Sequence, residues 1–180
     1  IPFRMKLLTL KFILIFIYLI SSSSSYAIQQ PNIKNLVIHK NPKKLEKINF
    51  ENINNEIINL NEFKNSLIII NFWATWCAPC IEEMPSLDRL AVNSNFNNLE
   101  ILPINIGRDS IEKSKNFYKK LKINNLKIYF DKDLELANKF LLRGLPTTVF
   151  INKKGEEFAR VIGFINFDDK KIIKWLQKYD

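Results

Sequence analysis

The strongest hydrophobic pattern in the chain is an unbroken apolar run that changes at once to helical spacing. Residues 66–73 read SLIIINFW, and a continuous β-branched run of this length is typical of a strand buried on both faces. From residue 80 the sequence CIEEMPSLDRLAVNS places apolar residues at helical spacing, and Pro79 stands near the first helical position, where its missing N–H costs nothing. The pattern predicts a central strand that leads directly into a helix.

Strand-like and helical segments continue to alternate along the rest of the chain. Before the central strand, residues 48–60 are typical of a hairpin that turns at Asn54-Asn55. After the helix, strands are predicted over 98–106, 126–130, 147–151 and 157–164, and helices over 109–121, 133–140 and 168–179. We expect Asp109 and Glu112 to form a capping box, and Asp131 or Asp133 to cap the following helix. This alternation is typical of an α/β domain.

Composition and charge narrow the class of protein. The chain has 180 residues, 47% of them hydrophobic, which is enough for one domain with a sizeable core. Its formal charge is +9, and residues 1–27 carry three basic residues and no acid, so +6 remains on residues 28–180. The remaining lysines are scattered among acids, whereas nucleic-acid binding needs a clustered basic stripe with stacking aromatics. We therefore expect no nucleic-acid partner.

The first residues have the features of a targeting segment. A basic region is followed by the nine-residue apolar run Phe12–Ile20, and Ser25 and Ala27 suit a cleavage site. The run is shorter than the roughly 20 residues that span a bilayer. We interpret residues 1–27 as an export signal, either cleaved or retained as a membrane anchor, residues 28–44 as a loose lead-in, and residues 45–180 as the folded domain. The predicted location is the periplasm or cell envelope.

The chain has two cysteines, Cys77 and Cys80, in the sequence CAPC. A disulfide between them would close almost no loop, so it would add little as a structural cross-link. A metal site would need more ligands, and the single histidine, His39, is interpreted as an exposed linker residue. No metal and no cofactor are expected, and redox chemistry is the remaining interpretation.

The predicted elements place the cysteines where such chemistry is favoured. Cys77 falls between the central strand and the start of the helix, where free N–H groups and the helix dipole stabilise a thiolate. Cys80 lies one turn further on, shielded by the helix, and can attack a mixed disulfide formed by Cys77. We predict an exposed, nucleophilic Cys77 and a resolving Cys80.

From about Lys44 to its end the chain resembles the thioredoxin superfamily, and within it the exported, TlpA-like thiol–disulfide oxidoreductases. The resemblance depends on FWATWCAPC, on Pro85, on RGLPTTVFI at residues 143–151, and on an additional helix and strand at 109–130. It implies a three-layer α/β fold with a central mixed sheet flanked by helices. It further implies an N-terminal hairpin and a helix-plus-strand insertion in that fold.

The resemblance assigns roles to several residues around the cysteines. Pro146 would be a cis-proline that faces the disulfide, and Leu145 would offer backbone hydrogen bonds to a substrate peptide. Trp76 would pack beside the sulfurs at a contact surface. Trp73 is expected in the core.

Two departures from thioredoxin itself concern proton transfer. Asn71 stands where thioredoxin has a buried aspartate. Thioredoxin also has a buried lysine near the position of Pro103, and this chain has no lysine there. Glu83 matches an acid of the TlpA-like branch and could exchange a proton with Cys80. The alternative is a surface carboxylate near a helix N-terminus, as expected for Glu82. A carboxylate at Glu83 would also oppose thiolate formation at Cys77.

The resemblance implies a reductant of protein disulfides that supports the maturation of cytochrome c or of a copper site in cytochrome oxidase. Its clients would be an apocytochrome or a copper-delivery protein, and its electrons would come from a membrane thiol carrier. An exported oxidase or isomerase, or a non-catalytic binding module on the same fold, are the alternatives. A peroxiredoxin is disfavoured because Thr75 stands two residues before Cys77, where that class has a threonine three residues before its cysteine.

Overall fold

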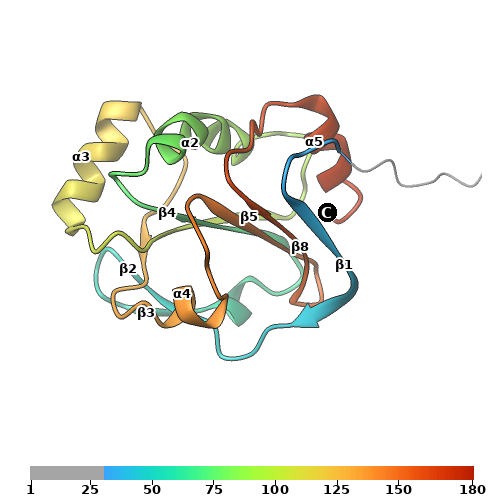
Figure 1. Ribbon diagram of the computed structural model, residues 1–180, viewed down its shortest axis with the longest axis horizontal. Coiled ribbons are helices and arrows are strands. Elements are labelled where there is room, and N and C mark those ends of the chain that lie inside the picture. Colours follow the sequence, from blue (N-terminus) through green and yellow to red (C-terminus); the bar gives the residue numbers. More distant parts are fainter. Residues whose placement is uncertain (1–30) are drawn as a thin grey trace, which may run out of the picture. The chain divides into compact units, whose positions relative to one another are not determined.

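One mixed sheet of eight strands forms the centre of the computed structural model, which describes residues 31–180 (Figure 1). The strands lie in the order β1-β8-β7-β4-β5-β6-β2-β3. The pairs β4–β5 and β5–β6 are parallel, and all other neighbours are antiparallel. The strands are β1 Leu36–Lys44, β2 Asn49–Asn52, β3 Ile57–Asn59, β4 Leu67–Trp73, β5 Leu99–Asn105, β6 Tyr129–Phe130, β7 Thr147–Ile151 and β8 Glu156–Ile162.

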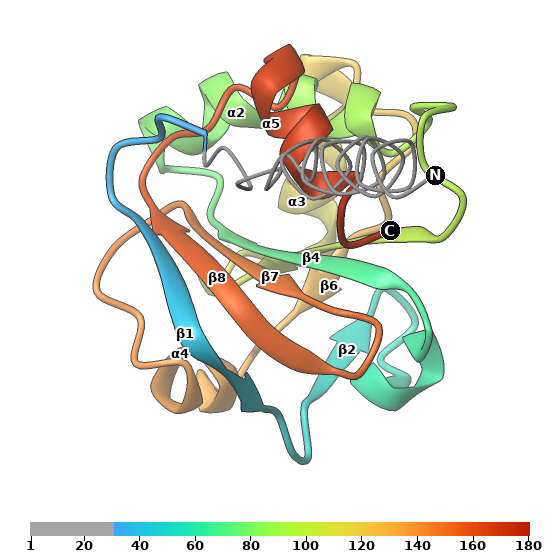
Figure 2. The ribbon, with the colours of Figure 1, turned by 90° about the vertical axis from the view of Figure 1, so that its right-hand side faces the viewer.

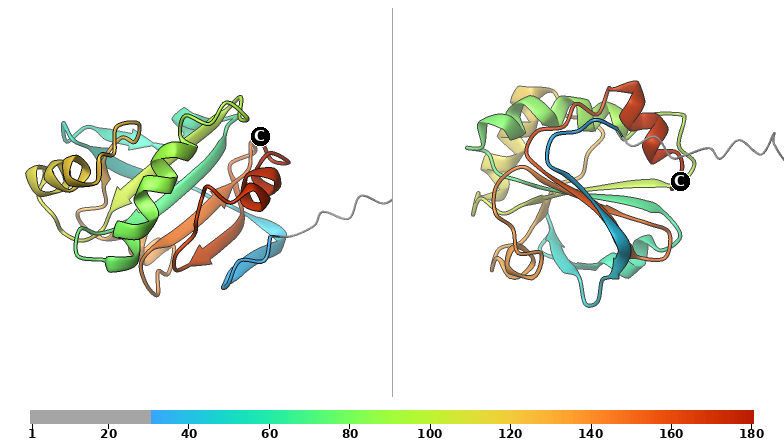
Figure 3. Two further views of the ribbon diagram at one scale, coloured as in Figure 1. Left: turned by 90° about the horizontal axis from the view of Figure 1, so that it is seen from above. Right: turned by 45° about the vertical axis from the view of Figure 1, so that its right-hand side comes forward.

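Helices cover both faces of this sheet (Figure 2). On one face lie α2 (Ala78–Leu90), α3 (Ile111–Leu121) and α5 (Lys170–Leu176), with α2 between the other two (Figure 3). On the other lie the 3₁₀ helix η1 (Leu60–Phe63) and α4 (Glu135–Lys139). The predicted three-layer fold is confirmed, including the hairpin β2–β3 and the insertion of α3 and β6.

The central strand β4 divides the core into two halves. Every residue of β4 is buried, and successive side chains point to opposite faces, as strand geometry requires. Leu67, Ile69 and Trp73 pack with α2 and α5, whereas Ile68 and Ile70 pack with η1 and α4. Because β4 is held on both faces and by both neighbouring strands, its C-terminal end is a rigid place from which to start the loop that carries Cys77.

The interpretation of residues 28–44 as a loose lead-in is wrong for Leu36–Lys44, which form the edge strand β1. Leu36 and Ile38 pack against the core, while Pro42 is tolerated because an edge strand leaves one row of backbone groups unpaired. His39 is likewise not an exposed linker residue. Its Nε2 lies 2.8 Å from Oε1 of Glu157, and its side chain is only 11% exposed.

Several predicted boundaries and caps also differ from the structure. The strand expected over 126–130 is reduced to Tyr129–Phe130. Ser110 and not Asp109 caps α3, by accepting the N–H of Lys113. The N-cap position of α4 is Leu134, not Asp131 or Asp133, although the Asp131 carboxylate accepts the N–H groups of Leu136 and Ala137 in the first turn. The hairpin turn at Asn54-Asn55 is confirmed, with Asn55 at a φ of 63°.

The two ends of the described chain lie at opposite ends of the sheet. Leu36 is in register with Val161, which pairs with Thr148 and through it with Asn71, near the C-terminal end of β4. The Asp180 side chain instead accepts the N–H groups of residues 97 and 98, just before β5 and next to the start of β4. The predicted export signal, residues 1–27, lies outside the described residues. Within residues 31–180 no helix has the length and apolar character needed to cross a bilayer.

Candidate active site

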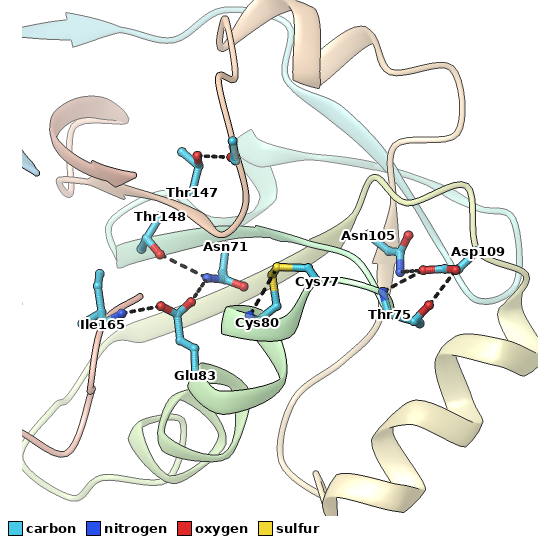
Figure 4. Close-up of a disulfide and its surroundings, with 11 residues drawn as sticks. Asn71, Thr75, Cys77, Cys80, Glu83, Asn105, Asp109, Thr147, Thr148 and Ile165 are labelled. Atoms are coloured by element: carbon cyan, nitrogen blue, oxygen red, sulfur yellow. Dashed lines mark hydrogen bonds between the residues drawn. A yellow bond between two sulfur atoms is a disulfide. The ribbon is translucent and has the colours of Figure 1, made fainter. Parts of the chain in front are cut away.

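Cys77 and Cys80 form a disulfide at the start of α2, with their Cα atoms 5.3 Å apart (Figure 4). Cys77 is the N-cap residue, with an extended backbone, and its Sγ accepts the N–H of Cys80 at 3.3 Å. The helix N-terminus therefore directs a hydrogen-bond donor at the sulfur that would carry the negative charge. Cys77 is less exposed than expected: only 4% of its surface is accessible in the disulfide form, against 1% for Cys80.

Glu83 lies one turn beyond Cys80 and is fully buried, so the surface alternative for this residue is wrong. Its Oε1 accepts Nδ2 of Asn71 at 2.6 Å, and its Oε2 accepts the backbone N–H of Ile165 at 2.6 Å. Burial raises the pKa of Glu83 from 4.5 to about 8, although the bonds from Ile165 and Asn71 partly offset this effect. Residues three apart on a helix have Cβ atoms about 5–6 Å apart, so this acid lies close to Cys80.

The raised pKa of Glu83 changes the expectation that a negative charge on this residue opposes thiolate formation at Cys77. Below about pH 8 the neutral acid predominates, so at neutral pH Glu83 opposes thiolate formation at Cys77 much less than a carboxylate would. Asn71 Nδ2 also contacts Thr148 Oγ1 at 3.1 Å, while its Oδ1 accepts no hydrogen bond from the residues that the structure describes. Pro103 is the register partner of Asn71 on β5, and it has no proton to exchange. Of Asn71, Pro103 and Glu83, only Glu83 has a side chain that titrates, and its exchange of a proton with Cys80 stays a prediction.

A second polar network holds the loop on the other side of the disulfide (Figure 4). Asp109 accepts the backbone N–H and the hydroxyl of Thr75, and also Nδ2 of Asn105. Our sequence reasoning missed this contact because it assigned Asp109 to the cap of α3. A usable signal was present, since the carboxyl ends of the parallel strands β4 and β5 adjoin and residues that follow them lie close together.

The remaining predicted site residues lie at the same end of β4 or on the adjoining loop. The peptide bond between Leu145 and Pro146 is cis, as expected. Pro146 is buried and directly precedes Thr147, the register partner of Phe72. Leu145 is partly buried and packs against both halves of the core. The roles assigned to both residues towards a substrate stay predictions.

The two tryptophans near the cysteines have opposite environments. Trp73 is fully buried, as expected. Trp76 is 65% exposed, which suits the predicted contact surface, although its contact with a substrate stays a prediction. Across residues 31–180, no group of three or more His, Cys, Asp or Glu side chains is arranged to hold a metal ion.

Comparison with known proteins places this site in a family. The family model described as "AhpC/TSA family" matches residues 42–156, which include both cysteines. The chain belongs to the AhpC/TSA family. It is 31% identical to the thiol-disulfide oxidoreductase ResA of Bacillus subtilis (strain 168) over 113 residues, and 32% identical to ResA of Halalkalibacterium halodurans over 111 residues. These matches cover 63% and 61% of this chain, and the chain spans 62% of the length of each relative.

Solved structures of other proteins share the fold of this chain. A DsbF homologue from Corynebacterium diphtheriae superimposes with a TM-score of 0.67 at 21% identity, over 83% of this chain and 96% of that chain. The exposed lipoprotein thioredoxin Etrx1 from Streptococcus pneumoniae strain TIGR4 gives a TM-score of 0.62 at 26% identity, over 74% and 99%. The domain therefore has a thioredoxin-like fold.

Proposed function

We propose that this protein is a thiol–disulfide oxidoreductase that reduces disulfides in client proteins. The observation that carries the proposal is the Cys77–Cys80 pair at the start of α2 with the buried acid Glu83 one turn away. A structural cross-link would need neither the helix N-terminus nor a proton-exchanging group beside it. The relatives named thiol-disulfide oxidoreductase support the same reaction class.

In the reduced protein, the Cys77 thiolate attacks one sulfur of a client disulfide. A mixed disulfide forms, and the first client sulfur leaves as a thiolate that takes up a proton. Cys80 then loses its proton, attacks Cys77 Sγ and closes the intramolecular disulfide, while the second client sulfur leaves. Two electrons pass to the client, and the protein ends oxidised.

Glu83 would move the proton in the second step. Its carboxylate form accepts the proton of Cys80, and its acid form returns one to the departing client thiolate. A pKa of about 8 suits this exchange, because a general acid–base group works best when its pKa lies near the operating pH. Asn71 and Ile165 hold the two carboxyl oxygens in place for it.

The reducing direction rests on the residues between the cysteines and on the resemblance to a reducing branch. The two residues between the cysteines, Ala78 and Pro79, are uncharged, and neither is a histidine. Their side chains therefore add nothing to the stabilisation of the Cys77 thiolate. A less stabilised thiolate makes the disulfide form a weaker oxidant. We therefore place the potential of the pair nearer to thioredoxin than to a dedicated oxidase.

The cellular setting is proposed from the sequence alone. Residues 1–27 have the features of an export signal or membrane anchor, which would place the domain in the periplasm or cell envelope. There the proposed clients are an apocytochrome or a copper-delivery protein that must keep its thiols reduced. A membrane thiol carrier would return the enzyme to its dithiol form.

Equilibration with glutathione buffers of known potential tests the direction of the reaction. We expect a potential closer to about −270 mV, the thioredoxin value, than to about −120 mV, the value of a strong oxidant. A value near the oxidant's would reverse the assignment. The Cys80→Ala variant should trap clients as mixed disulfides on Cys77, whereas the Cys77→Ala variant should trap none. Equal trapping by both variants would contradict the assigned roles of the two cysteines.

A further inference from the structure

We infer that Asp109 is a positioning residue for Cys77, acting through Thr75 in the loop that joins β4 to α2. The inference rests on the proposed thiol–disulfide exchange and adds a residue from a different loop to that site. Asp109 lies between β5 and α3, 32 residues after Cys77 in sequence. No contact of Asp109 with either sulfur is needed for the role, because the loop transmits its effect.

The contacts of Asp109 are concentrated on the loop before Cys77. Its Oδ2 accepts the backbone N–H of Thr75 at 2.9 Å, and its Oδ1 accepts the Thr75 hydroxyl at 2.8 Å. Thr75 thus has both its backbone and its side chain held by one carboxylate. The next turn is closed by Cys77, whose N–H bonds to the carbonyl of Ala74 at 3.2 Å.

The carboxylate is itself fixed by its surroundings. Asn105 Nδ2 lies 3.0 Å from Oδ2 and Lys113 Nζ 2.6 Å from Oδ1, and the Asp109 side chain is only 1% exposed. Burial alone would raise the pKa of Asp109, but the hydrogen bonds from Lys113, Asn105 and Thr75 outweigh it and lower the pKa. Asp109 therefore stays ionised at neutral pH, with a donor or cation on each side.

Gly107 brings the same loop into direct contact with the redox loop. A Cβ atom at this position would lie 2.6 Å from Cβ of Ala74, 2.8 Å from Oδ2 of Asp109 and 3.1 Å from Nε1 of Trp76. Only a glycine leaves room for this approach without a shift of one partner. The β5–α3 loop therefore lies against Ala74, Thr75 and Trp76, the three residues that directly precede Cys77.

We expect the loss of Asp109 to slow mainly the attack of Cys80 on Cys77, because this step depends most on the relative position of the two sulfurs. Cys80 is fixed within α2, whereas Cys77 is the N-cap residue at the end of the loop that Asp109 holds. Closure of the disulfide requires Cys80 Sγ to approach Cys77 Sγ along the bond to the departing sulfur. A misplacement of about 1 Å can slow a reaction about 10²-fold. Attack by Cys77 on an external disulfide makes no such demand on Cys80.

Reaction of the reduced protein with the aromatic disulfide DTNB separates the two steps. Cys77 attacks DTNB and releases one thionitrobenzoate, and Cys80 then attacks the mixed disulfide and releases a second, so both phases are read by absorbance. In Asp109→Asn we expect the second phase to be about tenfold slower. The first phase should be unchanged or faster, since a negative charge near Cys77 is lost.

Asp88→Asn is the matched control for a buried, hydrogen-bonded aspartate. Asp88 accepts the backbone N–H groups of Asn124, Asn125 and Leu126, at the far end of α2 from the disulfide. In the Asp88→Asn variant, both phases of thionitrobenzoate release should match those of the unmodified protein. An unchanged second phase in Asp109→Asn, or equal slowing of both phases, would overturn the inference.

Substitutions at Thr75 keep the test available if Asp109→Asn does not fold. Thr75→Ser retains the hydroxyl that bonds to Asp109, whereas Thr75→Val removes it at nearly constant shape. We expect Thr75→Val to slow the second phase about threefold and Thr75→Ser to leave it unchanged, and equal rates would overturn the inference. If the unmodified protein releases no second thionitrobenzoate, the proposed exchange itself fails, which is a separate outcome.

Discussion

The buried acid Glu83 should make the free energy of unfolding fall as pH rises, and the substitution Glu83→Gln should remove this contribution. We consider Glu83→Gln, which keeps the size of the side chain and cannot ionise. In the native protein burial raises the pKa of Glu83 to about 8, whereas in the unfolded chain it returns to about 4.5. Between these values the folded state holds a proton that the unfolded state has released.

The sign and size of the effect follow from this difference in bound protons. A raised folded-state pKa contributes stability that is fully present below pH 4.5, declines as pH rises, and is lost above about pH 8. Each pH unit in this window lowers the free energy of unfolding by up to about 1.4 kcal/mol, or about 5 kcal/mol in all. From pH 5 to pH 7 the unmodified protein should lose about 2.7 kcal/mol relative to Glu83→Gln.

Urea unfolding of the oxidised proteins, followed by tryptophan fluorescence at pH 5, 6, 7 and 8, measures this difference directly. All other titrating groups are common to both proteins, so they cancel in the comparison. Glu82→Gln is the control, because Glu82 is an exposed neighbour on the same helix. Stability curves of Glu83→Gln that run parallel to those of the unmodified protein would refute the burial and protonation of Glu83.

Three further outcomes are expected. In the reduced protein, brief iodoacetamide treatment at neutral pH should label Cys77 before Cys80, as read by mass mapping, and the reverse order would contradict the assigned nucleophile. Gly107→Ala should lower the free energy of unfolding by about 1–3 kcal/mol, because its methyl group would lie 2.6 Å from Cβ of Ala74; an unchanged melting temperature would contradict this. Trp76→Ala should change stability by less than about 0.5 kcal/mol, yet slow reduction of protein disulfides more than of DTNB, and equal slowing would argue against a client contact.

The parts of the fold that could be predicted are those with strong local patterns. The run at 66–73 differs from β4 by one residue at its start, and Pro79 lies at the beginning of α2 as expected. These signals depend only on side-chain periodicity and on the missing N–H of proline. The position of Cys77 at the strand–helix junction followed from them without any tertiary information.

The parts that failed depend on partners distant in the sequence. β1 is stabilised by β8, more than 110 residues away, and its own polar sequence with Pro42 gives no strand pattern. The burial of Glu83 depends on the segment at Ile165, which is 82 residues further on. His39 appeared isolated because Glu157 lies on that same distant strand. No local pattern contains these pairings.

The start of β1 and the side chain of Asp180 lie at opposite ends of the sheet, so the point of attachment decides which end stays free. β1 begins at the same end of the sheet as the C-terminal end of β4, with β8 and β7 between the two strands, so a label or surface joined just ahead of β1 would be attached at that end of the sheet. The side chain of Asp180 binds at the opposite end, next to the start of β4. Attachment at residue 180 would therefore leave the end of the sheet that carries the Cys77–Cys80 disulfide free, whereas attachment just ahead of β1 would place the support at that end.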